Sequence, residues 1–162
     1  MPRYFSQTFG VVGAILEKDG KIALVKENMP DKPDNGKWNQ PAGWIEVGED
    51  PIISVKREVE EETGFEFEPT GVLSICSLVR KDLTDHYNAT PHAIKIIFIG
   101  KIKTDKQKTL HNDVSEIKWF SPDEIYAMDN QTLRDVDIKD LVKDYLTGKH
   151  YSLELIKHTV QN

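Results

Sequence analysis

Residues 43–65 read GWIEVGEDPIISVKREVEEETGF, and the second half of this stretch is bounded by helix signals at both ends. Asp50 followed by Pro51 is typical of a helix start, because the aspartate side chain accepts a backbone N–H bond and proline fits the first helical position. Thr63-Gly64 is typical of a helix end, because glycine adopts the left-handed backbone conformation that closes a helix. The sequence therefore predicts a short helix between these signals.

Three carboxylates lie on one face of this predicted helix. Glu58, Glu61 and Glu62 stand at positions i, i+3 and i+4. An adjacent apolar stripe is formed by Ile52, Val55 and Val59. Like charges at this spacing repel by a few tenths of a kcal/mol per pair unless a cation neutralises them. Oxygen ligands grouped in this way suit a hard divalent ion such as Mg2+ or Mn2+, and a solvated acidic surface is the alternative interpretation.

The loop before the helix offers further oxygen ligands. Residues 41–49 contain Gly43 and Gly48, so the backbone of this loop can approach an ion or a phosphate closely. Its carbonyl oxygens would then lie beside the helix carboxylates. Loop and helix are therefore expected to form one site.

The whole stretch resembles the signature of the Nudix hydrolase family, G-x5-E-x7-R-E-U-x-E-E-x-G-U, in which U is apolar. Every fixed position is matched, namely by Gly43, Glu49, Arg57, Glu58, Val59, Glu61, Glu62, Gly64 and Phe65. The resemblance implies an α/β fold of the Nudix type, an α/β/α sandwich with a mixed sheet. It also implies metal-dependent hydrolysis of a phosphoanhydride bond.

The resemblance assigns roles to individual residues. The ligands that it implies for Mg2+ or Mn2+ are the main-chain carbonyl of Ala42 and the carboxylates of Glu58, Glu61 and Glu62. Arg57 is expected to pair with Glu49 and so to tie the loop to the helix, although an ordinary surface ion pair would look the same in the sequence.

The reaction of the family requires a general base. Family members cleave a phosphoanhydride by attack of water on phosphorus, and a carboxylate must accept the proton of that water. One candidate is Glu58 on the signature helix. The other is Asp113, which stands before the last predicted strand at a position that the family often fills with glutamate. Asp113 has an alternative role as a turn-capping residue after His111-Asn112.

Three stretches outside the signature resemble the phosphatase-type subgroup of the family: residues 38–43, the Leu133-Arg134 pair and the tail from Gly148 to Ile156. Those enzymes release orthophosphate from nucleoside di- and triphosphates and from the pyrimidine diphosphate precursor of thiamine. We therefore expect a small-molecule nucleotide or diphosphate substrate and release of orthophosphate. The alternatives are hydrolysis of ADP-ribose or dinucleoside polyphosphates, and a non-catalytic ligand-sensing role.

Substrate contacts are expected from six side chains, those of Trp38, Asn39, Gln40, Arg80, Lys95 and Arg134. The amides offer donors and acceptors to a base, and the cations suit phosphate oxygens, onto which a guanidinium forks. Hydrogen bonding within a loop is the alternative for the amides, and solvation is the alternative for the cations. Phe9 and Tyr87 are candidates to stack on a base, or they pack like most aromatic side chains near strands.

Length and charge bound the remaining possibilities. The 162 residues suffice for a single domain over residues 1–162 with a sizeable core. The net charge of -6 argues against a broad surface for nucleic acid or for an anionic membrane. Cys76 is the single cysteine of the chain, so no internal disulfide forms and a reducing compartment is indicated. With neither a signal-peptide core nor a long apolar run, a cytoplasmic protein is expected. We expect it to be a monomer or a homodimer.

The rest of the pattern is mixed α/β. Strands are predicted over residues 9–16, 21–26, 72–80, 93–102 and 116–120, the first two paired as a hairpin through Lys18-Asp19-Gly20. Residues 27–37 and 81–91 are predicted loops. Ser121 and Glu124 have the spacing of a capping box, and a last helix is expected from Leu133 to Leu146 with Gly148 as its stop.

Overall fold

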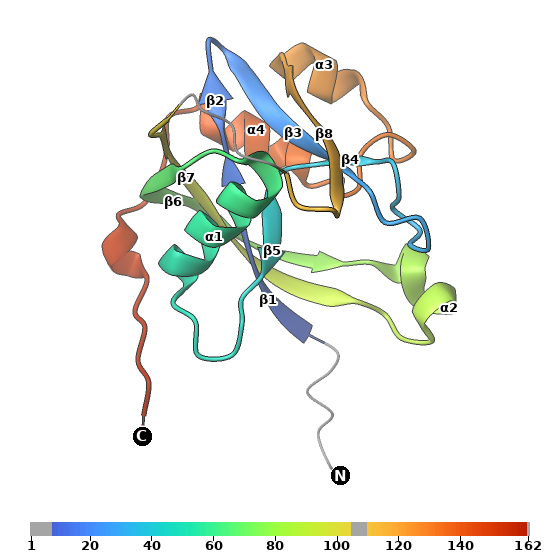
Figure 1. Cartoon of the computed structure of the whole chain (residues 1–162), viewed down its shortest axis with the longest axis horizontal. Helices are drawn as coiled ribbons and strands as arrows, with labels where there is room; N and C mark the ends of the chain where they lie inside the picture. The colour runs from blue at the N-terminus through green and yellow to red at the C-terminus, as the bar shows by residue number, and fades with distance from the viewer. Residues whose placement is uncertain (1–7, 105–109, 162) are drawn as a thin grey trace.

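The computed structural model describes residues 8–104 and 110–161 (Figure 1). Its strands are β1 (Thr8–Ile15), β2 (Glu17–Lys18), β3 (Lys21–Glu27), β4 (Trp38–Asn39), β5 (Ala42–Trp44), β6 (Phe67–Val79), β7 (His92–Ile102) and β8 (Val114–Phe120). Its helices are α1 (Pro51–Thr63), α2 (Thr84–Tyr87), α3 (Pro122–Ala127) and α4 (Ile138–Leu146), with the short 3-10 turns η2 (Lys81–Leu83) and η3 (Leu153–Leu155).

The strands form two sheets. One has the order β5-β1-β7-β6, in which β1 runs antiparallel to β5 and parallel to β7, while β6 and β7 are antiparallel. The other combines β2, β3 and β4, with β8 paired to β3. Parallel and antiparallel pairs thus occur side by side, and the predicted mixed sheet is confirmed.

Helices cover both faces of the first sheet (Figure 1). Successive residues of a strand point to opposite faces. Val12 and Ala14 of β1 accordingly belong to the same buried cluster as Val55 and Val59 of α1. Ile15 belongs to the other buried cluster, together with Ile138, Leu141 and Val142 of α4. The expected α/β/α sandwich is therefore confirmed, with the signature helix packed on the sheet through its apolar stripe.

The predicted ends of the signature helix are confirmed in atomic detail. The Asp50 carboxylate accepts a hydrogen bond from the Ile52 N–H at 2.8 Å, and Pro51 is the first helical residue. Gly64 has a φ of 70° and donates its N–H to the Glu60 carbonyl at 2.8 Å. The capping box of Ser121 and Glu124 is also present at the start of α3.

The predicted pairing of the first two strands is only partly correct. The turn at Asp19-Gly20 joins β2 to β3, as expected. However, β1 does not pair with β3, because it lies in the other sheet between β5 and β7. The residues of β1 near its end are apolar and buried on both faces. A strand of this kind is most stable in the interior of a sheet that is covered on both sides.

The predicted start of the last helix is wrong by five residues, since α4 begins at Ile138 and not at Leu133. The chain before α4 is occupied by pairing with β4 instead. The Trp38 N–H donates to the Thr132 carbonyl at 2.8 Å, and the Arg134 N–H donates to the Trp38 carbonyl at 2.9 Å. Backbone groups used in this way cannot also form a helical turn.

Three further observations complete the fold. The predicted connection over residues 81–91 contains η2 and α2 and projects beyond the sheet (Figure 1). Cys76 of β6 is a free, half-buried thiol. Within residues 8–104 and 110–161, the structure has no helix that is both long and apolar enough to cross a membrane.

Candidate active site

The carboxylates of α1 face the glycine loop, as the sequence predicted. Glu62 Oε2 accepts a hydrogen bond from the Ala42 N–H at 2.9 Å. The Glu58 carboxylate lies so close to Gly43 that a Cβ atom at position 43 would overlap it. Only glycine allows this close approach between strand and side chain. The structure thus brings Ala42, Gly43, Glu58 and Glu62 together.

Burial disfavours the charged forms of Glu58 and Glu62. Burial raises the pKa of Glu58, and it raises the pKa of Glu62 well above the usual range. The neighbouring carboxylates of Glu27 and Glu58 raise the pKa of Glu62 further. A bound cation would favour the charged form of both groups, so the environment fits an ion at this face of α1.

In this structure the carboxylates of Glu58, Glu61 and Glu62 contact other groups of the protein. Glu58 Oε1 lies 2.7 Å and Glu61 Oε2 lies 3.3 Å from Arg57 Nη1. Because these two carboxylates turn to Arg57, and Glu62 turns to Ala42, no three His, Cys, Asp or Glu side chains of the described ranges surround a common centre. The donor set nevertheless fits a hard divalent ion by its chemistry, with three carboxylates on one helix face beside a strand backbone.

Arg57 also makes the expected pair with Glu49. Its Nε and Nη2 atoms fork onto Oε1 and Oε2 of Glu49, each at 2.9 Å, and Nη2 lies 3.1 Å from the Trp44 carbonyl oxygen. The hydrogen bonds from Arg57 hold the pKa of Glu49 at about 2, far below its ordinary value of 4.5. The loop is thereby tied to α1 at both of its ends.

Asp113, the second candidate base, is exposed on the loop before β8. The His111 N–H donates to the Glu61 carbonyl at 2.9 Å, so this loop is anchored to the end of α1. The Asp113 carboxylate lies 3.4 Å from His111 Nδ1 and does not contact the α1 carboxylates among the described residues. The loop is therefore close to α1, while the Asp113 side chain is turned to its own neighbour.

A cavity of about 470 Å3 opens beside β5. Its apolar wall includes Phe9 and Trp44, whose rings stack with centroids 4.7 Å apart, and Tyr87 of α2. Ala42 and Gly43 also line it, so the cavity and the carboxylate face of α1 share one edge. Its volume suits a small organic ligand.

Four of the six expected substrate contacts line this cavity, namely Asn39, Arg80, Lys95 and Arg134. Trp38 and Gln40 do not line it, because Trp38 is partly buried against the core and Gln40 lies in the interior. Trp38 packs edge-on against Phe120, with ring centroids 4.9 Å apart. Gln40 is fully buried, and its side-chain amide has no hydrogen-bond partner in the part of the chain that the structure describes. The expectation that these two side chains contact substrate is therefore not supported by their positions.

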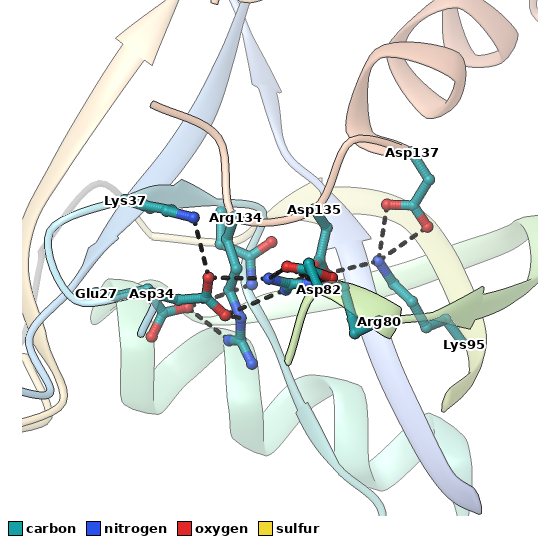
Figure 2. Close-up of polar contacts among 10 residues, drawn as sticks. Glu27, Asp34, Lys37, Arg80, Asp82, Lys95, Arg134, Asp135 and Asp137 are labelled. Atoms are coloured by element: carbon teal, nitrogen blue, oxygen red, sulfur yellow. Dashed lines mark hydrogen bonds and ion pairs between the residues drawn. The ribbon is translucent and has the colours of Figure 1, made fainter. Parts of the chain in front are cut away.

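Three cations of the cavity wall, Arg80, Lys95 and Arg134, are bound by carboxylates that the sequence interpretation did not single out (Figure 2). Lys95 is only 1% exposed, and its ammonium lies 3.1 Å from carboxylate oxygens of Asp135 and Asp137. Arg80 Nη2 lies 3.0 Å from Asp34 Oδ1, and Arg134 Nη1 lies 2.7 Å from Glu27 Oε1. The sequence does contain a sign of two of these carboxylates, because Asp135 and Asp137 follow closely after Arg134, an expected cation.

The comparisons with known proteins agree with this geometry. The model of the NUDIX domain family matches residues 6–142. Phosphatase NudJ of Escherichia coli strain K12 is 28% identical over 148 residues, which cover 90% of this chain and 88% of that protein.

Solved structures show the same fold. A NUDIX hydrolase from Nitrosomonas europaea is 30% identical with a TM-score of 0.75, and the match covers 94% of this chain and 98% of that one. The MutT protein from Methanosarcina mazei Go1 is 24% identical with a TM-score of 0.72, covering 91% and 99% of the two chains.

The fork between Arg57 and Glu49 predicts a pH-dependent contribution to stability. A carboxyl whose folded pKa is depressed stabilises the fold above its unfolded pKa and loses this effect as the pH falls toward the folded pKa. We expect Glu49→Gln to lower the free energy of unfolding at neutral pH, and the deficit relative to wild type to shrink between pH 4.5 and about 2. Urea unfolding of both proteins across this pH range measures the difference between their free energies of unfolding. Glu46→Gln, in the same loop but without an ion pair to Arg57 in the described residues, is the control. A deficit that does not change with pH would contradict the assignment.

Proposed function

The chain belongs to the NUDIX domain family and is a Nudix hydrolase, and on this premise we propose that it hydrolyses phosphoanhydride bonds in nucleoside di- and triphosphates or similar small diphosphates, with release of orthophosphate. The observation that carries the proposal is the shared edge at Ala42 and Gly43. The same two residues border the α1 carboxylates on one side and the cavity on the other. A ligand in the cavity would therefore present its phosphates to α1.

The polar groups at this edge suit a phosphate chain. Arg134 lines the cavity, and it is close enough to Glu62 to lower the pKa of that carboxyl. Among the described residues, Nη1 of Arg134 donates to Glu27, the buried Nε lies 3.5 Å from Asp34 Oδ2, and Nη2 has no hydrogen-bond acceptor. The guanidinium therefore retains donors for phosphate oxygens. The aromatic side chains of Phe9, Trp44 and Tyr87 lie in the remaining wall and suit a planar organic group.

We assign the cation to the donor set Ala42 carbonyl, Glu58, Glu61 and Glu62, with Mg2+ or Mn2+ as the ion. When bound, such an ion screens the phosphate charge and activates water for attack. The chain itself would orient the substrate through Arg134 and hold the loop in place through Arg57. Gly43 leaves the space that the Glu58 carboxylate occupies.

Glu58 is our candidate for the general base. It lies against Gly43, which lines the cavity, so its carboxylate borders the space where a substrate would lie. Asp113 is the second candidate, because its loop is anchored to α1 through the Glu61 carbonyl. Its exposed carboxylate would have to leave His111 to reach a substrate.

Release of orthophosphate is supported by the relatives. The protein from Escherichia coli that is 28% identical over most of both chains is named a phosphatase. Residues 38–43 and Arg134, which resemble the phosphatase-type subgroup, meet at β4, where the backbone of Trp38 bonds that of Arg134.

The first prediction of this proposal concerns the cation. We expect hydrolysis to stop in excess EDTA, and Glu62→Gln to lower turnover by at least about a hundredfold, because it removes a charged oxygen ligand while keeping the side-chain shape. The variant should remain folded, since the change relieves repulsion from Glu27 and Glu58. Turnover and circular dichroism measure the two effects. Near-normal activity of the variant, or activity in EDTA, would refute the cation assignment.

The second prediction separates the two candidate bases by their pH profiles. A general base works in its deprotonated form, so kcat/KM falls as the pH drops through its pKa. With Glu58 as base, Glu58→Gln should abolish this acidic limb and weaken binding of the ion, while Asp113→Asn should keep the wild-type profile from about pH 5 to 9. Loss of the acidic limb in Asp113→Asn, with unchanged affinity for the ion, would transfer the role to Asp113.

The third prediction concerns the bond that is cleaved. In 18O-labelled water, a nucleoside triphosphate should yield labelled orthophosphate, because water attacks the terminal phosphorus. Arg134→Ala should lower kcat/KM by roughly 30- to 1,000-fold, the effect of losing a charged hydrogen bond to the transition state. Arg134→Lys, which keeps a cation beside buried Glu27, controls for a loss of stability. Label in pyrophosphate or nucleoside monophosphate without orthophosphate would overturn the assignment.

A further inference from the structure

The wall of the cavity away from α1 contains cations whose hydrogen-bonding capacity is already used (Figure 2). Arg80 has five N–H donors. Nη1 and Nη2 donate to the two carboxylate oxygens of Asp34 at 3.1 and 3.0 Å. Nη1 also donates to Asp135 at 3.2 Å. Nε and Nη2 donate to Asp82 at 2.9 and 2.7 Å. Every donor of this guanidinium therefore has a carboxylate acceptor.

Lys95 is saturated in the same way. An ammonium group has three donors. Three oxygens accept them at 3.1 Å, one from Asp135 and two from Asp137. Lys95 is 1% exposed, and its partner Asp135 is 7% exposed. Asp34, which is paired with Arg80, is 5% exposed. The pairs Lys95–Asp135 and Arg80–Asp34 are therefore buried and are not solvated surface contacts.

The arrangement cancels positive charge at one end of the cavity only. At the end next to Ala42, Arg134 donates to Glu27 through Nη1 and lies 3.5 Å from Asp34 Oδ2 through Nε, while its Nη2 has no acceptor in the described chain. At the other end, four carboxylates surround the three cations Lys37, Arg80 and Lys95, and these carboxylates are Asp34, Asp82, Asp135 and Asp137. The remaining cation of the lining, Lys32, is exposed, and its ammonium lies 5.9 Å from the ring centre of Tyr87.

We propose that this wall selects the organic half of the substrate by charge, admitting an uncharged aromatic group and excluding one that carries a negative charge. Asp82 and Asp137, together with the more deeply buried Asp34 and Asp135, are then residues that determine specificity. They act by withholding Arg80 and Lys95 from the substrate. This inference rests on the proposed function, since it concerns the group that enters the cavity while the phosphates lie at α1.

The physical reason is the cost of placing an anion beside the carboxylates that already occupy every donor of Arg80 and Lys95. An anionic group that enters loses water, and like charges placed together across a contact disfavour binding. An uncharged ring loses little hydration and gains contact with Phe9, Trp44 and the apolar residues Leu78 and Ala93. The same wall therefore treats two ligands of equal shape and different charge unequally.

Two analogues of uridine diphosphate test this directly. 5-Carbamoyluridine and 5-carboxyuridine, each as the non-hydrolysable 5′-methylenediphosphate, have nearly the same shape, and only the second has a charged ring substituent. We expect the wild-type chain to bind the carbamoyl compound at least about tenfold more tightly in calorimetric titrations with Mg2+. In the double variant Asp82→Asn, Asp137→Asn, which frees donors of Arg80 and Lys95, the preference should fall to within about threefold.

Controls separate this inference from the stability of the chain and from the proposed function. Asp82 is an exposed residue, with 58% of its side chain accessible, so Asp82→Asn alone provides a variant that should fold. Asp85→Asn removes the same charge three residues away, without a contact to Arg80 in the described chain, and should keep the wild-type preference. Equal binding of the two compounds by wild type, binding of neither, or an unchanged preference in the double variant would overturn the inference. Binding with the expected preference, together with no hydrolysis of the corresponding 5′-diphosphates, would uphold it and contradict the proposed function.

Discussion

Arg57 is the side chain on which the arrangement of the candidate active site depends. Its guanidinium forks onto Glu49, reaches the Trp44 carbonyl and contacts Glu58 and Glu61, so one residue joins the glycine loop to α1 and supplies positive charge to the helix carboxylates. The remaining features follow from this contact. Once the loop is fixed, β5 pairs with β1 and its Ala42 N–H meets Glu62. The cavity then opens on the other side of the same short strand.

Positive charge is distributed unequally between the two ends of the cavity, and this difference would orient a bound substrate. At α1, burial and mutual repulsion raise the pKa values of Glu58 and Glu62, a condition that a bound cation relieves. At the opposite wall, Arg80 and Lys95 are fully bound by carboxylates. A diphosphate compound with an uncharged ring matches this distribution, with its phosphates toward the helix and its ring toward the aromatic wall. A buried ion-pair network adds little net stability in general. The ligand selection that we propose would give the network around Arg80 and Lys95 a role other than stability.

Local sequence patterns predicted the parts of the structure that local interactions determine. The start of α1 at Asp50-Pro51, its end at Gly64 and the carboxylate face all depend on residues within a few positions of each other. The sheet assignment of β1, the late start of α4 and the pairing of Lys95 with Asp137 depend on contacts between residues far apart in the chain. Lys95 illustrates the difficulty, since a lysine between isoleucines in a strand gives no sign of its acceptors. They come from the chain just before α4, and periodicity carries no information about them.

The most direct test of this account is a crystal structure of the full chain with Mg2+ and the non-hydrolysable analogue uridine 5′-methylenediphosphate. We expect Mg2+ bound by Glu58, Glu61 and Glu62, the phosphonate groups between α1 and Arg134, and the uracil ring in the cavity against Phe9 or Trp44. We also expect Arg80 and Lys95 to keep their carboxylate partners and not to contact the ligand. A phosphonate bound by Arg80 or Lys95, or a ring bound outside the cavity, would contradict these expectations.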